Sequence, residues 1–161
     1  MLRILFVCHG NICRSPMAEF VMKDLVHKDG LSGQIAAESA ATSSEEIGNT
    51  VYPPAKRILQ THGIGIPGND LGLSAKRSRR ITDEDYGKYD LLIGMDTANI
   101  RNLMKKYAND PDGKIHSMME FTDRPGDVAD PWYTGDFDAT WHDVREGCTG
   151  LLLWLQTQGK I

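Results

Sequence analysis

Short apolar segments alternate with helix-like segments along almost the whole of this chain of 161 residues. Four segments have the apolar, branched or small residues of buried strands, at 2–7, 35–41, 91–95 and 114–118. Between and after them lie segments with an apolar face at helical spacing, and residues 137–155 show the clearest example. This alternation predicts an α/β fold, a single doubly wound sheet of about four parallel strands with helices on both faces.

Local signals predict where several helices begin and end. Ser15 followed by Pro16 is typical of a helix start, with Ser15 as the N-cap, and Gly30 is the expected end of that helix. Further predicted elements are a helix at 54–62, a short strand at 71–73, a capping box from Thr82 to Asp85 and a helix from Asp96 to Tyr107.

Length, charge and cysteine content narrow the class of protein. We expect one domain over residues 1–161, because this length matches a single hydrophobic core. The net charge of −4 disfavours nucleic-acid binding, since an acidic protein repels a phosphate backbone. No apolar run approaches the roughly 18 residues that span a bilayer, so membrane insertion is not expected. Three cysteines in a domain that needs no disulfide fit a reducing compartment, and we expect the protein in the cytoplasm.

The loop between the first predicted strand and the first predicted helix carries the most chemistry. From Cys8 to Ser15 it reads Cys-His-Gly-Asn-Ile-Cys-Arg-Ser, with five residues between Cys8 and Arg14. The amides of such a loop can form an anion nest, and the helix dipole adds about half a positive charge. The planar guanidinium of Arg14 can hold two oxygens of one phosphate group. The loop therefore predicts a site for a phosphate-sized dianion.

The same positive field acts on the thiol of Cys8. Cations and helix N-termini favour the thiolate, which is the nucleophilic form of cysteine. Gly10 permits close approach of the backbone, the amide of Asn11 can bond across the loop, and the hydroxyl of Ser15 can donate to the sulfur. These features predict a nucleophilic cysteine beside a bound anion.

The segment from Val7 to Pro16 resembles the signature loop of the low-molecular-weight protein tyrosine phosphatases. Three later segments agree with that family in order and spacing: Ser39–Ser43, Met95–Asp96 and Asp130–Tyr133. The resemblance extends over nearly the whole chain. It implies a phosphatase that acts on phosphotyrosine proteins or peptides, holds phosphate or sulfate in the loop, and needs no cofactor and no metal. We expect a monomer.

The resemblance also implies a role for each matching residue. Cys8 would attack phosphotyrosine to form a phosphocysteine, Arg14 would bind the phosphoryl group, and Asp130 would act first as general acid and then as general base. A phenolate has a conjugate-acid pKa of about 10, so a positioned acid contributes about 10²–10⁴ in rate. The phosphate-binding loop would comprise His9, Gly10, Asn11, Ile12, Cys13, Arg14 and Ser15, with Asn11, Ser15 and Ser39 as its support. The substrate pocket would be lined by Ile12, Glu45, Trp132 and Tyr133.

Three residues depart from the pattern of the family. His9 occupies a position where leucine is common, and Glu45 stands where many members have an aromatic residue at the rim. Lys76 replaces a frequent histidine that supports the asparagine and the serine of the loop. Substrate preference and loop rigidity therefore do not transfer directly from relatives.

The remaining motifs have two interpretations each. Cys13 either forms a reversible disulfide with Cys8, as in family members with a second cysteine in this loop, or simply packs, whereas Cys148 belongs to the core. The basic run at 76–80 is either a solvated face or a surface that attracts acidic phosphopeptides. Asp127 is the nearest competitor of Asp130 for the acid role, and Asp96 is expected to cap a helix.

Three other functions compete with phosphotyrosine hydrolysis. An arsenate reductase has a similar loop but requires two further cysteines in mid-chain, and no cysteine occurs between Cys13 and Cys148. A phosphotyrosine-binding module needs only the arginine and the amides, so the presence of Cys8 and Asp130 argues against it. A phosphocysteine carrier of sugar transport is not expected to have an arginine at this spacing.

Overall fold

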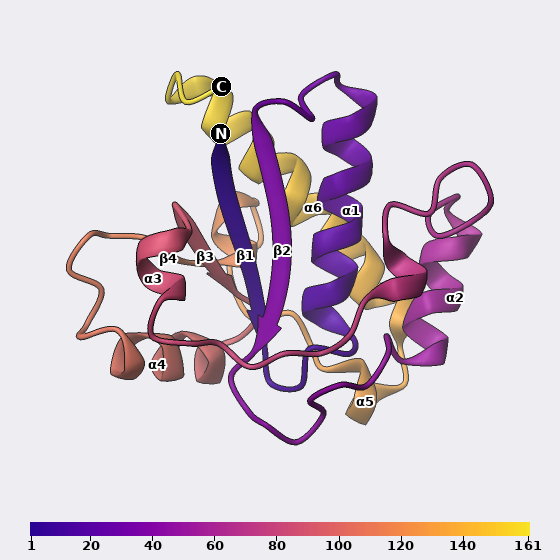
Figure 1. Ribbon diagram of the computed structural model, residues 1–161, viewed down its shortest axis with the longest axis horizontal. Helices are drawn as coiled ribbons and strands as arrows, with labels where there is room; N and C mark the ends of the chain where they lie inside the picture. The colour runs from indigo at the N-terminus through magenta and orange to yellow at the C-terminus, as the bar shows by residue number, and fades with distance from the viewer.

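All four strands join one parallel sheet (Figure 1). The strands are β1 (Leu2–Cys8), β2 (Ile35–Ala41), β3 (Leu91–Gly94) and β4 (Ile115–Ser117), and their order in the sheet is β2-β1-β3-β4. In the register of the central strand, Ile4 lies opposite Ala37 on one side and Leu91 on the other. The computed structural model, which describes residues 1–161, thus confirms the predicted sheet of parallel strands.

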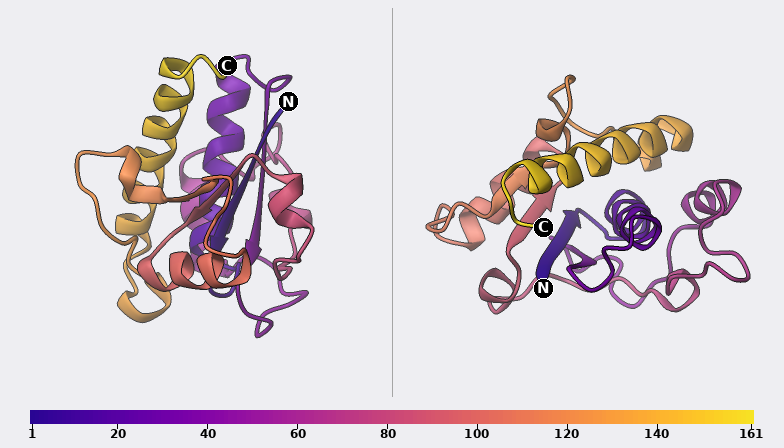
Figure 2. Two further views of the ribbon diagram at one scale, coloured as in Figure 1. Left: turned by 90° about the vertical axis from the view of Figure 1, so that its left-hand side faces the viewer. Right: turned by 90° about the horizontal axis from the view of Figure 1, so that it is seen from above.

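Helices cover both faces of the sheet (Figure 2). On one face, helices α1 (Arg14–Lys28), α2 (Pro53–Thr61) and α6 (Phe137–Thr157) pack in a hydrophobic cluster with Ile4 and Phe6 of β1. On the other face, α3 (Asp85–Lys88) and α4 (Thr97–Lys106) pack in a second cluster with Leu5 and Val7. Alternate residues of β1 enter different clusters because successive side chains of a strand point to opposite faces. The doubly wound arrangement is confirmed.

The predicted strand at 71–73 was wrong. Leu71 and Gly72 have φ values of 56° and 93°, in the left-handed region that no strand can accommodate at two successive residues. The chain turns there and continues as the short 3₁₀ helix η1 (Leu73–Ala75), with the side chain of Leu73 in the core. The apolar residues of this segment were interpreted as a strand, although they serve to anchor a turn.

Two predicted helix caps also differ from the structure. Helix α1 begins two residues earlier than predicted, at Arg14 with Cys13 as its N-cap, and the Ser15 hydroxyl contacts Cys8 instead of capping the helix. At Thr82, only half of the capping box forms: the Thr82 amide donates to the Asp85 carboxylate. The predicted cap at Asp96 is confirmed, since its carboxylate accepts from the backbone amide of Asn99 at 2.8 Å.

Two glycines in α6 allow this helix to pack closely against η2 (Met118–Phe121). A Cβ atom at Gly150 would lie 1.9 Å from the carbonyl oxygen of Phe121, and one at Gly147 would lie 2.7 Å from the side chain of Met118. Their cost in helix propensity is therefore offset by a contact that no larger residue permits. No helix of the fold, α6 included, combines the length and the apolar character needed to span a membrane.

Candidate active site

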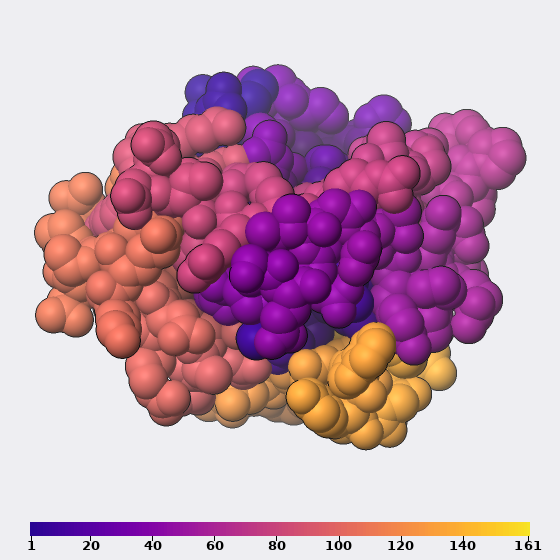
Figure 3. Space-filling model, turned by 60° about the horizontal axis from the view of Figure 1, so that its bottom comes forward, coloured from indigo at the N-terminus to yellow at the C-terminus, as the bar shows by residue number.

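The loop between β1 and α1 lies at the carboxyl ends of the strands, where ligands bind in open parallel sheets (Figure 1). In Figure 3 this indigo loop is visible at the base of a depression between the purple segment after β2 and the orange segment of α5 (Pro131–Thr134). The cleft measures about 230 Å³. It is lined by Cys8, His9, Gly10, Ile12, Cys13, Arg14, Glu45, Glu46, Asp130, Trp132 and Tyr133.

The sulfur of Cys8 is hydrogen-bonded within its own loop. The backbone amide of Asn11 donates to Sγ at 3.3 Å, and the hydroxyl oxygen of Ser15 lies 3.1 Å from the same sulfur. Asn11 has a φ of 57°, a left-handed conformation that asparagine tolerates better than most residues. This conformation lets the loop fold back over the sulfur. Donors in this position stabilise a negative charge on Sγ.

A buried hydrogen-bond network holds the loop in shape. The side-chain amide of Asn11 donates to the hydroxyls of Ser15 and Ser39, both at 2.8 Å. Ser39 in turn donates to the Glu19 carboxylate of α1 at 2.6 Å. The three residues predicted as loop support therefore lie together, and Glu19 is a fourth member that the sequence pattern did not indicate. The network links the loop to β2 and to the middle of α1.

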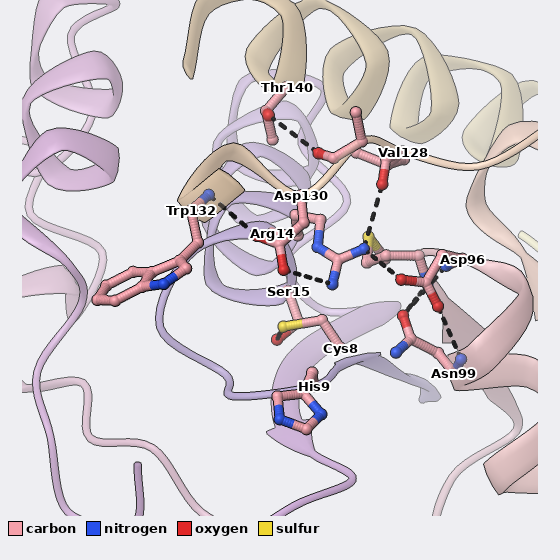
Figure 4. Close-up of polar contacts among 12 residues, drawn as sticks. Cys8, His9, Arg14, Ser15, Asp96, Asn99, Val128, Asp130, Trp132 and Thr140 are labelled. Atoms are coloured by element: carbon pink, nitrogen blue, oxygen red, sulfur yellow. Dashed lines mark hydrogen bonds and ion pairs between the residues drawn. The ribbon is translucent and has the colours of Figure 1, made fainter. Parts of the chain in front are cut away.

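The guanidinium of Arg14 is buried between two carboxylates (Figure 4). Nη1 donates to Asp96 at 2.6 Å and to the carbonyl oxygen of Val128 at 3.1 Å, and Nη2 donates to Asp130 at 3.4 Å. Burial lowers the pKa of Arg14, but the charges of Cys8, Asp96 and Asp130 outweigh it and raise the pKa above its ordinary value. Arg14 thus stays cationic and is held in one orientation. The ion pair with Asp96 was missed, because the sequence indicated only a helix cap at that residue.

Asp130 lies at the N-cap of α5 and faces Arg14. Its Oδ1 accepts from the backbone amide of Trp132 at 3.0 Å, which leaves Oδ2 directed at the guanidinium. The competing carboxylate of Asp127 is used elsewhere: it accepts from the amide and the hydroxyl of Thr97 at 3.0 and 2.9 Å. Asp127 therefore stabilises the start of α4, and it does not line the cleft.

The predicted pocket residues all line the mouth of the cleft. Trp132 and Tyr133 have exposed fractions of 54% and 85%. The ring of Tyr52 lies 4.9 Å from that of Trp132 and supports it from behind, a contact that the sequence gave no reason to expect. The Nε2 atom of His9 lies at hydrogen-bond distance from the Glu45 carboxylate, 3.0 Å, so two of the unusual residues of this chain are paired with each other. Glu46 is a second acidic residue of the rim and was not predicted.

The sequence model of the family described as low molecular weight phosphotyrosine protein phosphatase matches residues 3–160. The chain belongs to this family. It is 34% identical over its full length to the low molecular weight protein-tyrosine-phosphatase YfkJ of Bacillus subtilis, which is also covered fully. The crystal structure of YfkJ superposes with a TM-score of 0.90, covering 98% of this chain and 96% of YfkJ.

Two further solved structures have the same fold. A low molecular weight protein tyrosine phosphatase from Streptococcus pyogenes is 42% identical, with a TM-score of 0.81 and coverage of 98% of this chain and 93% of the other. A Drosophila arginine phosphatase is 27% identical, with a TM-score of 0.83 and coverage of 96% and 98%. Proteins with this fold therefore include one named as a tyrosine phosphatase and one named as an arginine phosphatase.

Lys76, which departs from the family pattern, contacts two members of the network that supports the loop, Ser39 and Glu19. Its ammonium group donates to the carbonyl oxygen of Ser39 at 2.8 Å and lies 3.2 Å from the Glu19 carboxylate. Burial lowers the pKa of Lys76, and Glu19 opposes that shift. Within the basic run, Arg79 is likewise paired, with Asp85 at 3.0 Å, while Arg77 and Arg80 are exposed. The run is therefore neither a uniform solvated face nor a uniform substrate surface.

Replacing Lys76 with methionine should lower the free energy of unfolding by about 1–3 kcal/mol, because Glu19 and the Ser39 carbonyl would each lose a charged donor while buried. Lys23 provides the matched control. It pairs with the other oxygen of Glu19 at 2.6 Å, but its side chain is 30% exposed. We expect Lys23→Met to cost less in urea unfolding. Equal losses in the two variants would contradict a special role of Lys76.

All three cysteines are free thiols in this structure. Cys13 lines the cleft beside Cys8, and burial, followed by the charges of Cys8 and Asp130, raises its pKa to about 12. Cys148 is fully buried among the apolar residues of α6 and α1, which confirms its place in the core. Nowhere in residues 1–161 do three or more His, Cys, Asp or Glu side chains gather in an arrangement that could hold a metal ion.

Proposed function

We propose that this chain is a protein tyrosine phosphatase that works through a phosphocysteine intermediate, and that residues 1–161 form one domain with this activity. The observation that carries the proposal is the meeting of three groups in one cleft: the Cys8 sulfur, the Arg14 guanidinium and the Asp130 carboxyl group. Cys8 is the last residue of β1, Arg14 is the first residue of α1, and Asp130 is the N-cap of α5. A nucleophile, an anion-binding group and a proton donor are the requirements of a two-step phosphoryl transfer.

In the first step, the phosphoryl group of the substrate lies in the loop and Cys8 attacks phosphorus as a thiolate. The sulfur–phosphorus bond forms as the bond from phosphorus to the phenolic oxygen breaks. Protonated Asp130 gives its proton to the departing oxygen, so the phenol leaves neutral. Arg14 and the loop amides neutralise the charge on the equatorial phosphoryl oxygens.

In the second step, Asp130 acts as a carboxylate. It takes a proton from a water molecule, and the water oxygen attacks phosphorus as the sulfur–phosphorus bond breaks. The Asn11 amide and the Ser15 hydroxyl, at 3.3 and 3.1 Å from the sulfur, stabilise the thiolate as it leaves. Asp130 regains its proton, inorganic phosphate departs, and the site returns to its starting state.

The walls of the cleft favour an aromatic leaving group. Trp132, supported by Tyr52, and Ile12 present apolar surface along the entrance to Cys8, which suits a flat phenyl ring. Glu45 and Glu46 add acidic groups at the rim, which would suit the guanidinium of phosphoarginine. We favour phosphotyrosine because Glu45 is already paired with His9, whereas the Trp132 side chain is 54% exposed and has surface left for an aromatic ring.

Release of inorganic phosphate from matched phosphopeptides tests this assignment. We expect hydrolysis of the phosphotyrosine peptide in the presence of EDTA, with kcat/KM at least about 100-fold above that of the phosphoserine peptide, whose side chain is too short to reach Cys8. The phosphoarginine peptide should also be a poorer substrate than phosphotyrosine. Binding of phosphotyrosine without turnover, or preferred hydrolysis of phosphoarginine, would overturn the proposal.

A further inference from the structure

A second cleft lies beside the catalytic cleft and has a basic lining. Its volume is about 420 Å³. It is bounded by the segment after β2, the chain before α3 and the exposed side of α4, through Thr42, Ser43, Arg80, Asn102, Lys105 and Lys106. None of the residues that line it carries a carboxylate. In a protein with a net charge of −4, this is a local concentration of positive charge.

The two clefts share a wall. His9 lines both of them. The amide of Thr42 donates to the carbonyl oxygen of Cys8 at 3.0 Å, and the hydroxyl of Ser43 donates to that of His9 at 2.9 Å. The segment after β2 is thus hydrogen-bonded to the start of the catalytic loop. The basic cleft therefore adjoins the catalytic cleft at His9, the residue that follows Cys8 in the chain.

The cations of this cleft are available to a ligand. Arg80 and Lys105 are exposed and form no ion pair with any carboxylate of residues 1–161. The Nε atom of Arg80 donates to the Thr42 carbonyl oxygen at 3.2 Å, which fixes the base of its guanidinium. Lys106 is paired only with Asp83, whose side chain is 90% exposed. Two of the three cations are therefore unpaired, and one of these is held in place.

The catalytic cleft itself is lined by two glutamates of the segment after β2. Glu45 and Glu46 belong to the catalytic cleft but not to the basic one. In Figures 1 and 3, α4 lies on one side of the segment after β2 and α5 lies on the other. A bound peptide would meet cations at the basic cleft and the carboxylate of Glu46 within the catalytic cleft itself. Such an arrangement distinguishes substrates by the position of their charges.

We propose that the basic cleft is a substrate subsite that binds an aspartate or glutamate side chain flanking phosphotyrosine. This inference rests on the proposed phosphotyrosine phosphatase activity. Because ion pairs at exposed sites are weak, the subsite should change kcat/KM by about three- to tenfold. Screening by salt should reduce this preference, whereas phosphate binding by buried Arg14 is less exposed to screening.

The test combines a double variant with three phosphotyrosine peptides. The variant Arg80→Gln/Lys105→Gln removes the two unpaired cations, and Arg57→Gln/Lys160→Gln is the matched control, since both of its residues are exposed and lie outside both clefts. The peptides carry glutamates before the phosphotyrosine, glutamates after it, or glutamine at all of these positions. p-Nitrophenyl phosphate, which is too small to reach the basic cleft, reports the basal activity.

We expect the unchanged protein to prefer one glutamate peptide over the glutamine peptide by three- to tenfold. The preference should vanish in Arg80→Gln/Lys105→Gln and persist in the control, with turnover of p-nitrophenyl phosphate within about twofold in all three proteins. Hydrolysis of every peptide without such a preference, or equal loss in both double variants, would overturn the subsite alone. If none of the substrates were hydrolysed, both the proposed phosphatase activity and the subsite would be overturned.

Discussion

Replacing Cys8 with serine should lower kcat for p-nitrophenyl phosphate by at least about 10⁴-fold. A serine hydroxyl is not ionised at neutral pH, and the groups that contact the Cys8 sulfur, the Asn11 amide and the Ser15 hydroxyl, are not bases, so the covalent step is lost. Arg14 and the loop amides remain, and the variant should still bind inorganic phosphate in calorimetry. Steady-state kinetics at neutral pH measures the loss. Turnover similar to that of the unchanged protein would contradict the nucleophilic role of Cys8.

Cys13 provides the control within the same loop. Cys13→Ser changes only the side chain and retains the backbone amide at this position, and we expect less than about a tenfold fall in kcat. Because burial raises the pKa of Cys13 to about 12, its thiol stays protonated at neutral pH and reacts slowly with alkylating agents. Iodoacetamide at pH 7 should therefore modify Cys8 alone, and inorganic phosphate should slow that reaction. Modification of Cys13 at a similar rate would show that the loop does not activate Cys8 selectively.

Replacing Asp130 with asparagine should lower kcat/KM for phosphotyrosine by about 10²–10⁴-fold, because the phenolate would leave without a proton. Asparagine retains an oxygen that can accept from the Trp132 amide, so the start of α5 should remain intact. With dinitrophenyl phosphate, whose leaving group is far less basic, we expect less than about a tenfold loss. The measurement is the dependence of kcat/KM on leaving-group basicity, which should be steeper in the variant.

Asp127→Asn is the control for Asp130→Asn. Asp127 stabilises the first residue of α4 through Thr97 and lies outside the cleft, so its loss should reduce the free energy of unfolding by about 1 kcal/mol. Any effect on rate should be small and equal for good and poor leaving groups. If Asp130→Asn also showed equal losses with both kinds of substrate, proton transfer from Asp130 would be excluded.

Much of the fold and the centre of the site followed from local patterns. The alternation of strands and helices is a local property, since each segment shows its own apolar periodicity, and it predicted the parallel sheet. The loop from Cys8 to Arg14 is continuous in sequence, so its residues had to lie together. The errors, at Leu71–Leu73 and at the Ser15 cap, arose where an apolar or polar residue had a tertiary partner that outweighed its local preference.

Contacts between segments that are distant in sequence could not be predicted from the sequence alone. Asp96 and Val128 hold the Arg14 guanidinium from two different loops, and the Tyr52 ring packs against that of Trp132 although the two residues are far apart in sequence. Lys76 was noticed only as an unusual residue, and its position beneath Ser39 and beside Glu19 gave it a function. These contacts join residues that are far apart in sequence. Which of them meet is decided by the packing of the whole fold, and the spacing of residues along the chain does not predict it.

The sequence by itself determined that a cysteine and an arginine would meet at the end of a strand and the start of a helix, because a short loop leaves its residues no other arrangement. The tertiary structure decided how that loop is held, which carboxylates surround Arg14, and that Arg80 and Lys105 gather beside His9. The reason is physical: local conformation depends on neighbours along the chain, whereas a site with charge on both sides requires packed segments from the whole fold.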